Sequence, residues 1–251
     1  TSRSDVNIIA VVNPKTHQIL LVTTPRDYYV EIPGISKGQN DKLTHAGIYG
    51  IDASMATLSQ LYETDINYYV RLNFTSLIDI VDILGGVDVY SELEFTTGKE
   101  SGCIVDVEEG YNHFNGEQAL AFSRERHNLA DGDNQRGKNQ QAVITAMIKK
   151  MLSPTMLLKA NGILNQVGKD IETNVSQPQL NSLIKYQLNT NAKWTIQSVA
   201  AEGTGAEDYC YSAKDMPLYV TVPDPTSVNE IIDLVNVVEE GGMLEDAEEL
   251  N

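Results

Sequence analysis

Two apolar runs near the beginning of the chain set the strongest limit on its fold. Residues 6–12 (VNIIAVV) and 18–24 (QILLVTT) are separated only by the turn-like sequence NPKT at 13–16. Two runs of this length, joined by so short a polar turn, predict a β-hairpin of two buried strands. The rest of the fold must therefore cover this hairpin.

The segments that follow alternate between helical and strand-like patterns. Residues 52–62 carry apolar side chains at helical spacing, residues 68–74 alternate like a strand, and residues 76–84 are helical up to a Gly-Gly pair. This strand–helix–strand order predicts an α/β fold with a mixed sheet covered by helices. Further helices are predicted at 116–122, 134–152, 155–168, 177–189 and 228–238, and further strands at 87–90, 194–200 and 218–222.

No repeat or linker divides the 251 residues, so the sequence predicts a single domain over residues 1–240. The acidic, glycine-containing segment at 241–251 is expected to be a disordered tail. No apolar run approaches the ~18 residues of a membrane span. The chain opens at Thr1 without an initiator Met, so we expect that an N-terminal piece has been removed.

The overall charge is strongly acidic, with 18 basic and 35 acidic residues and a formal net charge of −17. Nucleic-acid binding usually needs a broad basic face, so this class of partner is not expected. A small anionic ligand remains open where basic groups gather locally. All six arginines lie within the first 136 residues, and five of them stand beside carboxylates in short polar clusters. Arginine suits bidentate contact with phosphate, although solvated surface ion pairs are the alternative interpretation.

Two of these clusters flank the predicted hairpin. Arg3 and Asp5 precede its first strand, and Arg26 and Asp27 follow its second strand. Antiparallel pairing would bring Asp5 and Asp27 to the same end of the sheet, where two carboxylates suit Mg²⁺. The alternative is that both are turn and capping residues paired with the neighbouring arginines, and spacing alone favours that alternative.

Two further clusters lie between residues 124 and 140. Arg124 and Arg126 would point the same way in an extended segment and could reach one ligand. Arg136 and Gln140 stand one turn apart at the start of a predicted helix, where an anion is favoured. Asp133 lies just ahead and can serve as the N-cap. Together the four clusters predict a pocket for a phosphate ester with a bridging metal.

The two cysteines, Cys103 and Cys210, are too few to complete a zinc site and lack CxxC spacing. A single disulfide is the preferred interpretation, and two free thiols are the alternative. The four histidines are scattered and do not indicate a metal site or a Ser–His or Cys–His nucleophile.

Motifs along nearly the whole chain match one known family. They are RSD at 3–5, VNPKT at 12–16, TTPRDYYVEIPG at 23–34, DKLTHAGIYG at 41–50, YYVRLNF at 68–74, IDIVDILGGVDV at 78–89, FNGEQALAFSRERH at 114–127 and the set Gly132, Asp133, Arg136 and Gln140. In this combination the sequence resembles the LytR–CpsA–Psr family of Gram-positive bacteria. The family carries one more metal-binding aspartate on a strand before the RSD motif, which this chain does not contain.

The resemblance implies an α/β/α sandwich with an apolar tunnel for a lipid tail, with walls at 75–84 and 134–152. It implies a membrane-anchored extracellular phosphotransferase that moves teichoic acid, capsule or a similar phosphoglycan from a polyprenyl-pyrophosphate carrier to peptidoglycan, and that we expect to be a monomer. The cofactor would be Mg²⁺, held by Asp5 and Asp27. The implied pyrophosphate-binding residues are Arg3, Arg26, Arg124, Arg126, Arg136 and Gln140, and the implied catalytic residues are Arg3, Asp5, Arg26 and Asp133. Asp133 would act as base or orient the acceptor.

Three rival functions share these residues. The first is a non-catalytic binder that presents a polyprenyl phosphate to another enzyme. The second is a regulator of transcription, against which the net charge of −17, the lack of a recognisable recognition helix and the expected disulfide all argue. The third is hydrolysis of a polyprenyl pyrophosphate, with water as the acceptor.

Overall fold

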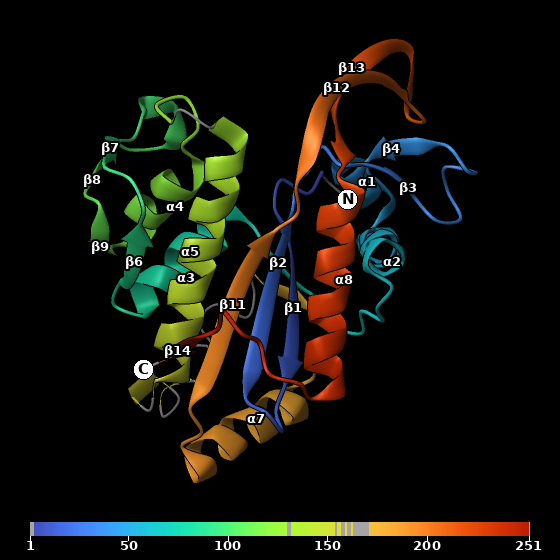
Figure 1. Ribbon diagram of the computed structural model, residues 1–251. Helices are drawn as coiled ribbons and strands as arrows, with labels where there is room; N and C mark the ends of the chain where they lie inside the picture. Colours follow the sequence, from blue (N-terminus) through green and yellow to red (C-terminus); the bar gives the residue numbers. More distant parts are fainter. Residues whose placement is uncertain are drawn as a thin grey trace. The chain divides into compact units, whose positions relative to one another are not determined.

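The computed structural model describes residues 3–129, 132–153, 155–156, 159, 162 and 171–250. The chain forms two compact units (Figure 1). Unit 1 consists of Thr1–Asn67 and Trp194–Glu249, and unit 2 of Tyr68–Lys193 with the last two residues. Two units can belong to one domain, so the single domain over residues 1–240 stays a prediction.

The predicted hairpin forms the centre of unit 1. Strands β1 (Asn7–Asn13) and β2 (Gln18–Thr24) pair antiparallel, and β2 is buried along its whole length. Strand β11 (Trp194–Ala200) lies parallel to β2, and β14 (Glu248–Leu250) completes a sheet of order β1-β2-β11-β14. The predicted mixed sheet is therefore confirmed. Parallel pairing explains why β2 reads as an unbroken apolar run rather than an alternating one.

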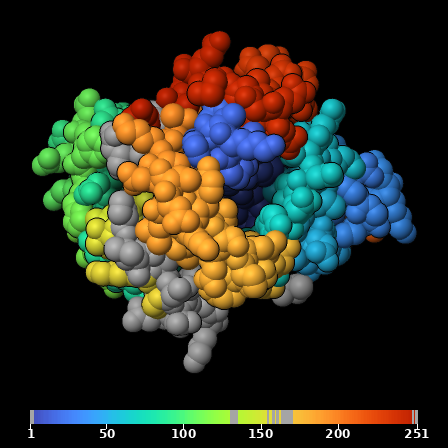
Figure 2. All heavy atoms as spheres, turned by 90° about the horizontal axis from the view of Figure 1, so that it is seen from below, coloured from blue at the N-terminus to red at the C-terminus, as the bar shows by residue number. Residues whose placement is uncertain are grey.

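Helices α2 (Ile51–Tyr62) and α8 (Pro225–Glu240) supply the apolar side chains that cover one face of this sheet. Helix α8 begins where the Asp224 carboxylate accepts a hydrogen bond from the N–H of Thr226 at 3.0 Å, an N-cap followed by proline at N1. Figure 2 shows the β1–β2 turn against the end of α8, where Asn13 Nδ2 donates to the Val238 carbonyl at 2.7 Å. The core of unit 1 includes Ile9, Leu20, Val22, Leu43, Tyr62, Ile231, Val235 and Val238.

The smaller elements of unit 1 form two hairpins and a helix. Strand β3 (Tyr29–Glu31) pairs with β4 (Asn40–Lys42), which leads directly into helix α1 (Leu43–Tyr49). Strand β12 (Gly203–Cys210) pairs with β13 (Ala213–Pro223) in a long two-stranded ribbon.

The segment after Glu240 follows a defined path, where the sequence predicts a disordered tail. Leu244 is buried, and its N–H donates to the side-chain carbonyl of Gln18 at 2.6 Å. The Gln18 amide in turn donates to the Gly242 carbonyl. Gln18 has no exposure to water, so these backbone groups satisfy its amide. The acidic, glycine-containing composition predicts a disordered tail, because composition cannot show that Gln18 binds this segment.

The described part of unit 2 contains three two-stranded pairs and several helices. Strand β5 (Val70–Leu72) pairs with β10 (Ile171–Thr173), β6 (Val87–Ser91) with β9 (Gly110–Phe114), and β7 (Phe95–Thr96) with β8 (Asp106–Val107). The helices are α3 (Phe74–Ile83), the short 3₁₀ turn η1 (Lys99–Ser101), α4 (Gly116–Arg124), α5 (Gly132–Leu152) and α7 (Gln177–Thr190). Only four residues of the helix predicted at 155–168 are described, so that prediction lies largely outside the described residues.

The core of unit 2 forms where α3, α4 and α5 meet β6 and β9. Phe122 on α4 lies 5.8 Å from the Phe95 ring and 5.4 Å from the Phe114 ring, centroid to centroid. Gly116 allows α4 to start close to α3, since a Cβ there would lie 2.4 Å from the Ile78 carbonyl oxygen. Among the described residues, no helix is both long and apolar enough to cross a bilayer.

Candidate functional site

The end of the β1–β2 hairpin brings three of the predicted site residues together. Because Asn7 pairs with Thr24, the same antiparallel register places Asp5 opposite Arg26. Arg26 Nη1 lies 2.7 Å from Asp5 Oδ1, and Arg26 Nε lies 3.5 Å from Asp27 Oδ2. The guanidinium group of Arg26 is therefore held between the two carboxylates that the sequence predicts for a metal.

Lys42 is a fourth member of this cluster, and local sequence patterns do not single it out. Its Nζ lies 2.9 Å from Asp27 Oδ1, and both side chains are nearly buried, at 14% and 12% exposure. The backbone brings Lys42 there, because the N–H of Leu43 donates to the Tyr28 carbonyl and that of Thr44 to the Arg26 carbonyl. Lys42 lies in the segment DKLTHAGIYG, one of the motifs shared with the family, and this was the sequence feature that could have identified it.

The charges in this cluster alternate from Lys42 to Asp27, Arg26 and Asp5. Burial by itself would lower the pKa of Arg26, but the charges of Asp27 and Asp5 outweigh it and raise that pKa above its ordinary value. The hydroxyls of Ser4 and Thr44 are buried and make no hydrogen bond to the described residues. Unused donors beside a permanent positive charge are suited to the oxygens of a phosphate.

The donor set at this end of the hairpin fits Mg²⁺ in chemical type, since Mg²⁺ takes one or two carboxylates and completes its shell with water and phosphate oxygens. Asp5 is half-exposed, at 52%, and within reach of solvent. Arg26 and Lys42 already neutralise both carboxylates. Among the described residues, no three acidic, histidine or cysteine side chains form a metal cluster. A metal here would compete with Arg26 for Asp5. The metal role of Asp5 and Asp27 stays a prediction.

Arg124 and Arg126 lie in unit 2, on the segment that ends α4. Both are exposed, and the Arg124 guanidinium carbon lies 4.9 Å from the centroid of the Phe74 ring. Arg126 Nε donates to His127 Nε2 at 3.2 Å, and His127 Nε2 also lies 3.2 Å from Glu100 Oε2. Each of the two guanidinium groups thus contacts a neighbouring ring.

Four further predicted site residues are Arg3, Asp133, Arg136 and Gln140. Arg136 and Gln140 are half-buried on α5, which begins at Gly132, two residues before the start that the sequence predicts. The Asp133 side chain lies outside the described residues, and Arg3 is exposed two residues before Asp5. The structure thus places Asp5, Arg26 and Asp27 together in unit 1, and Arg124 and Arg126 together in unit 2. Convergence of the two groups on one phosphate stays a prediction.

We expect Phe74→Leu to weaken binding of a prenyl pyrophosphate by roughly two- to fivefold, because a cation–π contact contributes about 0.5–1 kcal/mol at an exposed site. Titration calorimetry with geranyl pyrophosphate measures this change. Tyr90→Leu is the matched control, since Tyr90 is also exposed but contacts the Tyr111 ring, at 5.3 Å. Equal affinity in the wild type and Phe74→Leu would show that the Phe74 ring does not contribute to ligand binding.

The predicted disulfide between Cys103 and Cys210 is not formed. Both are free thiols, Cys103 half-buried and Cys210 buried at the end of β12. Cys103 Sγ lies 3.6 Å from the Glu117 carbonyl, so each sulfur has its own packed surroundings. Spacing along the chain could not distinguish the two interpretations, because it does not report these surroundings.

Thiol labelling should therefore separate the two cysteines. Burial raises the pKa of Cys103, and burial together with the Asp41 charge raises the pKa of Cys210 to about 11. In the native protein at pH 8 we expect a maleimide to modify Cys103 slowly and to leave Cys210 unmodified until urea unfolds the chain. Mass spectrometry without reductant measures both, and two thiols that react only after reduction would restore the disulfide.

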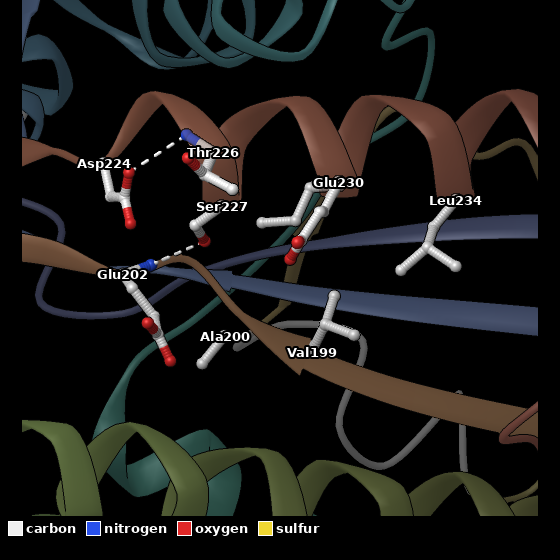
Figure 3. A pocket seen from close by; sticks show the side chains of 9 residues that line it. Val199, Ala200, Glu202, Asp224, Thr226, Ser227, Glu230 and Leu234 are labelled. Carbon is white, nitrogen blue, oxygen red and sulfur yellow. Dashed lines mark hydrogen bonds between the residues drawn. The ribbon is translucent and has the colours of Figure 1, made fainter.

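A cavity of about 370 Å³ lies in unit 1 beside the first half of α8. Figure 3 shows three carboxylates around it, those of Glu202, Asp224 and Glu230, with Val199 and Leu234 at its apolar end. Glu202 is fixed by its N–H, which donates to the Ser227 hydroxyl at 3.0 Å. None of the predicted site residues lines this cavity. Its negative charge makes it unsuitable for a pyrophosphate.

Comparison with known proteins decides the family. The sequence profile of the LytR_cpsA_psr family matches residues 1–222. The chain belongs to the LytR_cpsA_psr family. A curated relative, the polyisoprenyl-teichoic acid–peptidoglycan teichoic acid transferase TagU of Bacillus mycoides (strain KBAB4), is 36% identical over 226 residues, which cover 88% of this chain and 69% of the relative. The match to TagU of Bacillus cereus covers 66% of that protein, so the chain spans about two thirds of such relatives.

Solved structures of this family share the fold. TagV of B. subtilis superposes with a TM-score of 0.78 at 24% identity, covering 96% of this chain and 91% of TagV. TagT bound to LI-WTA superposes with a TM-score of 0.73 at 28% identity, covering 94% of this chain and 85% of TagT. The predicted LytR–CpsA–Psr membership and the predicted α/β fold are confirmed.

Proposed function

We propose that this chain is the catalytic part of a transferase that moves a phosphoglycan, such as teichoic acid, from a polyprenyl-pyrophosphate carrier to peptidoglycan. The relative from Bacillus mycoides is named as a transferase of this kind, and TagT was solved bound to LI-WTA. The observation that carries the proposal is the charge network of Asp5, Arg26, Asp27 and Lys42 at the end of the central hairpin. It places two fixed cations beside unused hydrogen-bond donors.

In the proposed reaction an acceptor hydroxyl on peptidoglycan attacks the glycan-side phosphorus of the pyrophosphate. The new bond joins that oxygen to phosphorus, and the bond to the prenyl phosphate breaks. The leaving group takes the bonding electrons and departs as prenyl monophosphate. Arg26 and Lys42 hold the negative oxygens, as Arg3, Arg124, Arg126, Arg136 and Gln140 would from their own segments. Asp133 would take the hydroxyl proton or orient the acceptor.

Mg²⁺ is part of the proposal, with Asp5 and Asp27 as its protein ligands. When bound, it would neutralise charge on the pyrophosphate oxygens. Arg26, which is paired with Asp5, would contribute its own positive charge at the same place. The lipid tail would lie in an apolar tunnel with α3 and α5 as candidate walls. We further propose that the protein acts as a monomer at the outer face of the cytoplasmic membrane of a Gram-positive bacterium, held by an N-terminal anchor.

A transfer assay tests this function. The chain, a polyprenyl-pyrophosphate-linked oligosaccharide and a peptidoglycan oligomer are incubated with Mg²⁺, and the products are separated by mass spectrometry. We expect a phosphodiester-linked conjugate and prenyl monophosphate in equal amounts, and neither product after chelation. Tight binding of the donor without product would replace the transferase by a binder. Release of the glycan phosphate to water, with or without acceptor, would replace it by a hydrolase.

A further inference from the structure

Glu125 is a completely buried acid between two exposed arginines. Its residue exposure is 0%, whereas Arg124 before it and Arg126 after it are both exposed. A buried carboxylate is costly unless hydrogen bonds or a cation compensate its charge. The partners of this carboxylate therefore reveal what it does.

Five neutral donors surround the Glu125 carboxylate. Its Oε1 accepts the N–H groups of Arg126 at 2.9 Å, His127 at 2.8 Å and Asn128 at 3.1 Å. Its Oε2 accepts the Gly98 N–H and the Ser101 hydroxyl, the latter at 3.0 Å. Burial alone would raise the pKa of Glu125, but these hydrogen bonds bring that pKa below its ordinary value. The group is therefore ionised at neutral pH.

None of the contacts described for these oxygens is to the guanidinium group of Arg124 or Arg126. A carboxylate paired with either arginine would cancel the positive charge that an anionic ligand needs. Backbone dipoles and a hydroxyl compensate the acid instead, so both cations keep their charge for a ligand.

The same hydrogen bonds fix the backbone around the two arginines. Helix α4 ends at Arg124, and Glu125 is extended, with ψ at 136°. Oε1 then binds three consecutive N–H groups, which forces the chain to turn at once. Oε2 connects this turn to the segment at 98–101, and Asn128 Nδ2 adds a bond to the Thr96 carbonyl at 2.8 Å. With the side chain of Glu125 directed inward, its neighbours on both sides are directed to the surface.

We propose that Glu125 is a positioning residue, whose buried carboxylate aims Arg124 and Arg126 at one pyrophosphate while leaving their charges uncompensated. This inference rests on the proposed function, since it assumes that the two arginines share that ligand. Fixing both guanidinium groups before binding reduces the ordering that the ligand must impose.

The first test is Glu125→Gln, which keeps the shape but turns an amide donor toward backbone donors. We expect affinity for geranyl pyrophosphate, measured by calorimetry, to fall by about 10- to 100-fold, as when supporting groups of a site are lost. In the transfer assay, KM for the lipid-linked donor should rise more than kcat falls. Glu117→Gln, a change of an exposed acid on the same helix, is the control and should leave affinity unchanged.

A double-mutant cycle separates positioning from general support of the fold. If Glu125 acts through the arginines, Glu125→Gln should cost little further affinity in an Arg124→Ala, Arg126→Ala background. An equal loss in both backgrounds would make the residue merely structural and overturn the proposal. So would a folded Glu125→Gln variant with wild-type affinity.

Ser101→Ala is a second variant for the case that Glu125→Gln does not fold. It removes one of the five donors, and we expect affinity to fall by about threefold; unchanged affinity would then overturn the proposal. If the wild-type chain does not bind geranyl pyrophosphate, the two arginines have no shared pyrophosphate ligand, and the proposal is overturned. A chain that binds it but forms no transfer product would overturn the transferase function and leave the role of Glu125 intact.

Discussion

Arg26→Ala is expected to lower kcat/KM for glycan transfer by about 10²–10³-fold, the usual effect of removing one fixed electrostatic donor from an active site. The guanidinium group is the only positive charge described between Asp5 and Asp27. Without this guanidinium group, the negative charges of Asp5 and Asp27 are less compensated, and they repel the pyrophosphate. Arg26→Lys should recover part of the rate, because it restores the charge but not the planar fork.

Arg71→Ala provides the matched control for this experiment. Arg71 lies on β5 and pairs with Glu172 on β10 at 3.5 Å, and it is as exposed as Arg26, at 36% against 35%. We expect kcat/KM to be unchanged, since exposed ion pairs of this kind contribute little. If Arg26→Ala and Arg71→Ala behave alike, the charge network at the end of the hairpin is not the reaction centre.

Asp41→Ala should destabilise unit 1 by about 3–5 kcal/mol, because it leaves several buried donors without their acceptor, each at a cost of about 1–3 kcal/mol. Asp41 has no exposure to water. Its carboxylate lies 2.6 Å from His45 Nδ1 and accepts the Ser212 N–H at 3.0 Å and the Lys42 N–H at 2.8 Å. Alanine would leave His45 buried without this partner and release the turn between β12 and β13. Urea unfolding measures the loss.

Asp88→Ala is the control, because Asp88 and His113 form the same kind of pair at 2.7 Å with both side chains more than half exposed. There we expect a loss of no more than about 1 kcal/mol. Equal losses in the two variants would show that burial of the Asp41 pair does not matter.

The contribution of Asp41 should also depend on pH. Burial would raise the pKa of Asp41, but hydrogen bonds from His45, Ser212 and Lys42 hold that pKa below its ordinary value. A depressed pKa means that the stabilisation is complete above the pKa of the unfolded chain and is lost as the pH falls through the folded pKa. The difference in unfolding free energy between the wild type and Asp41→Ala should therefore be constant near neutral pH and shrink in acid.

Local patterns predicted most of the fold. The hairpin at 6–12 and 18–24 followed from apolar runs and a turn, and its antiparallel register placed Asp5 near Arg26 and Asp27. Lys42 was missed because it reaches Asp27 only through pairing of two three-residue strands, β3 and β4, which are too short for a periodic signal.

The Arg124–Glu125–Arg126 segment shows a second limit. Alternation predicts that the two arginines share a side, and both are exposed, but a charged residue at position 125 gave no sign of complete burial. Its donors come from Gly98, Ser101 and the following turn, and composition cannot anticipate such a set of backbone groups. The predictions for the two cysteines and for residues 241–251 differ from the structure for the same reason. The surroundings of these residues depend on packing partners that are distant in sequence.

The parallel pairing of β2 with β11 has a consequence for synthesis. While residues between these strands are being made, β2 has only β1 beside it, and the N–H and C=O groups along its other edge lack partners. Nearly all of unit 2 is made in one stretch during that interval, so it can acquire its fold first. A partly folded chain is therefore vulnerable to aggregation along this open edge of β2 until Trp194–Ala200 has paired with it.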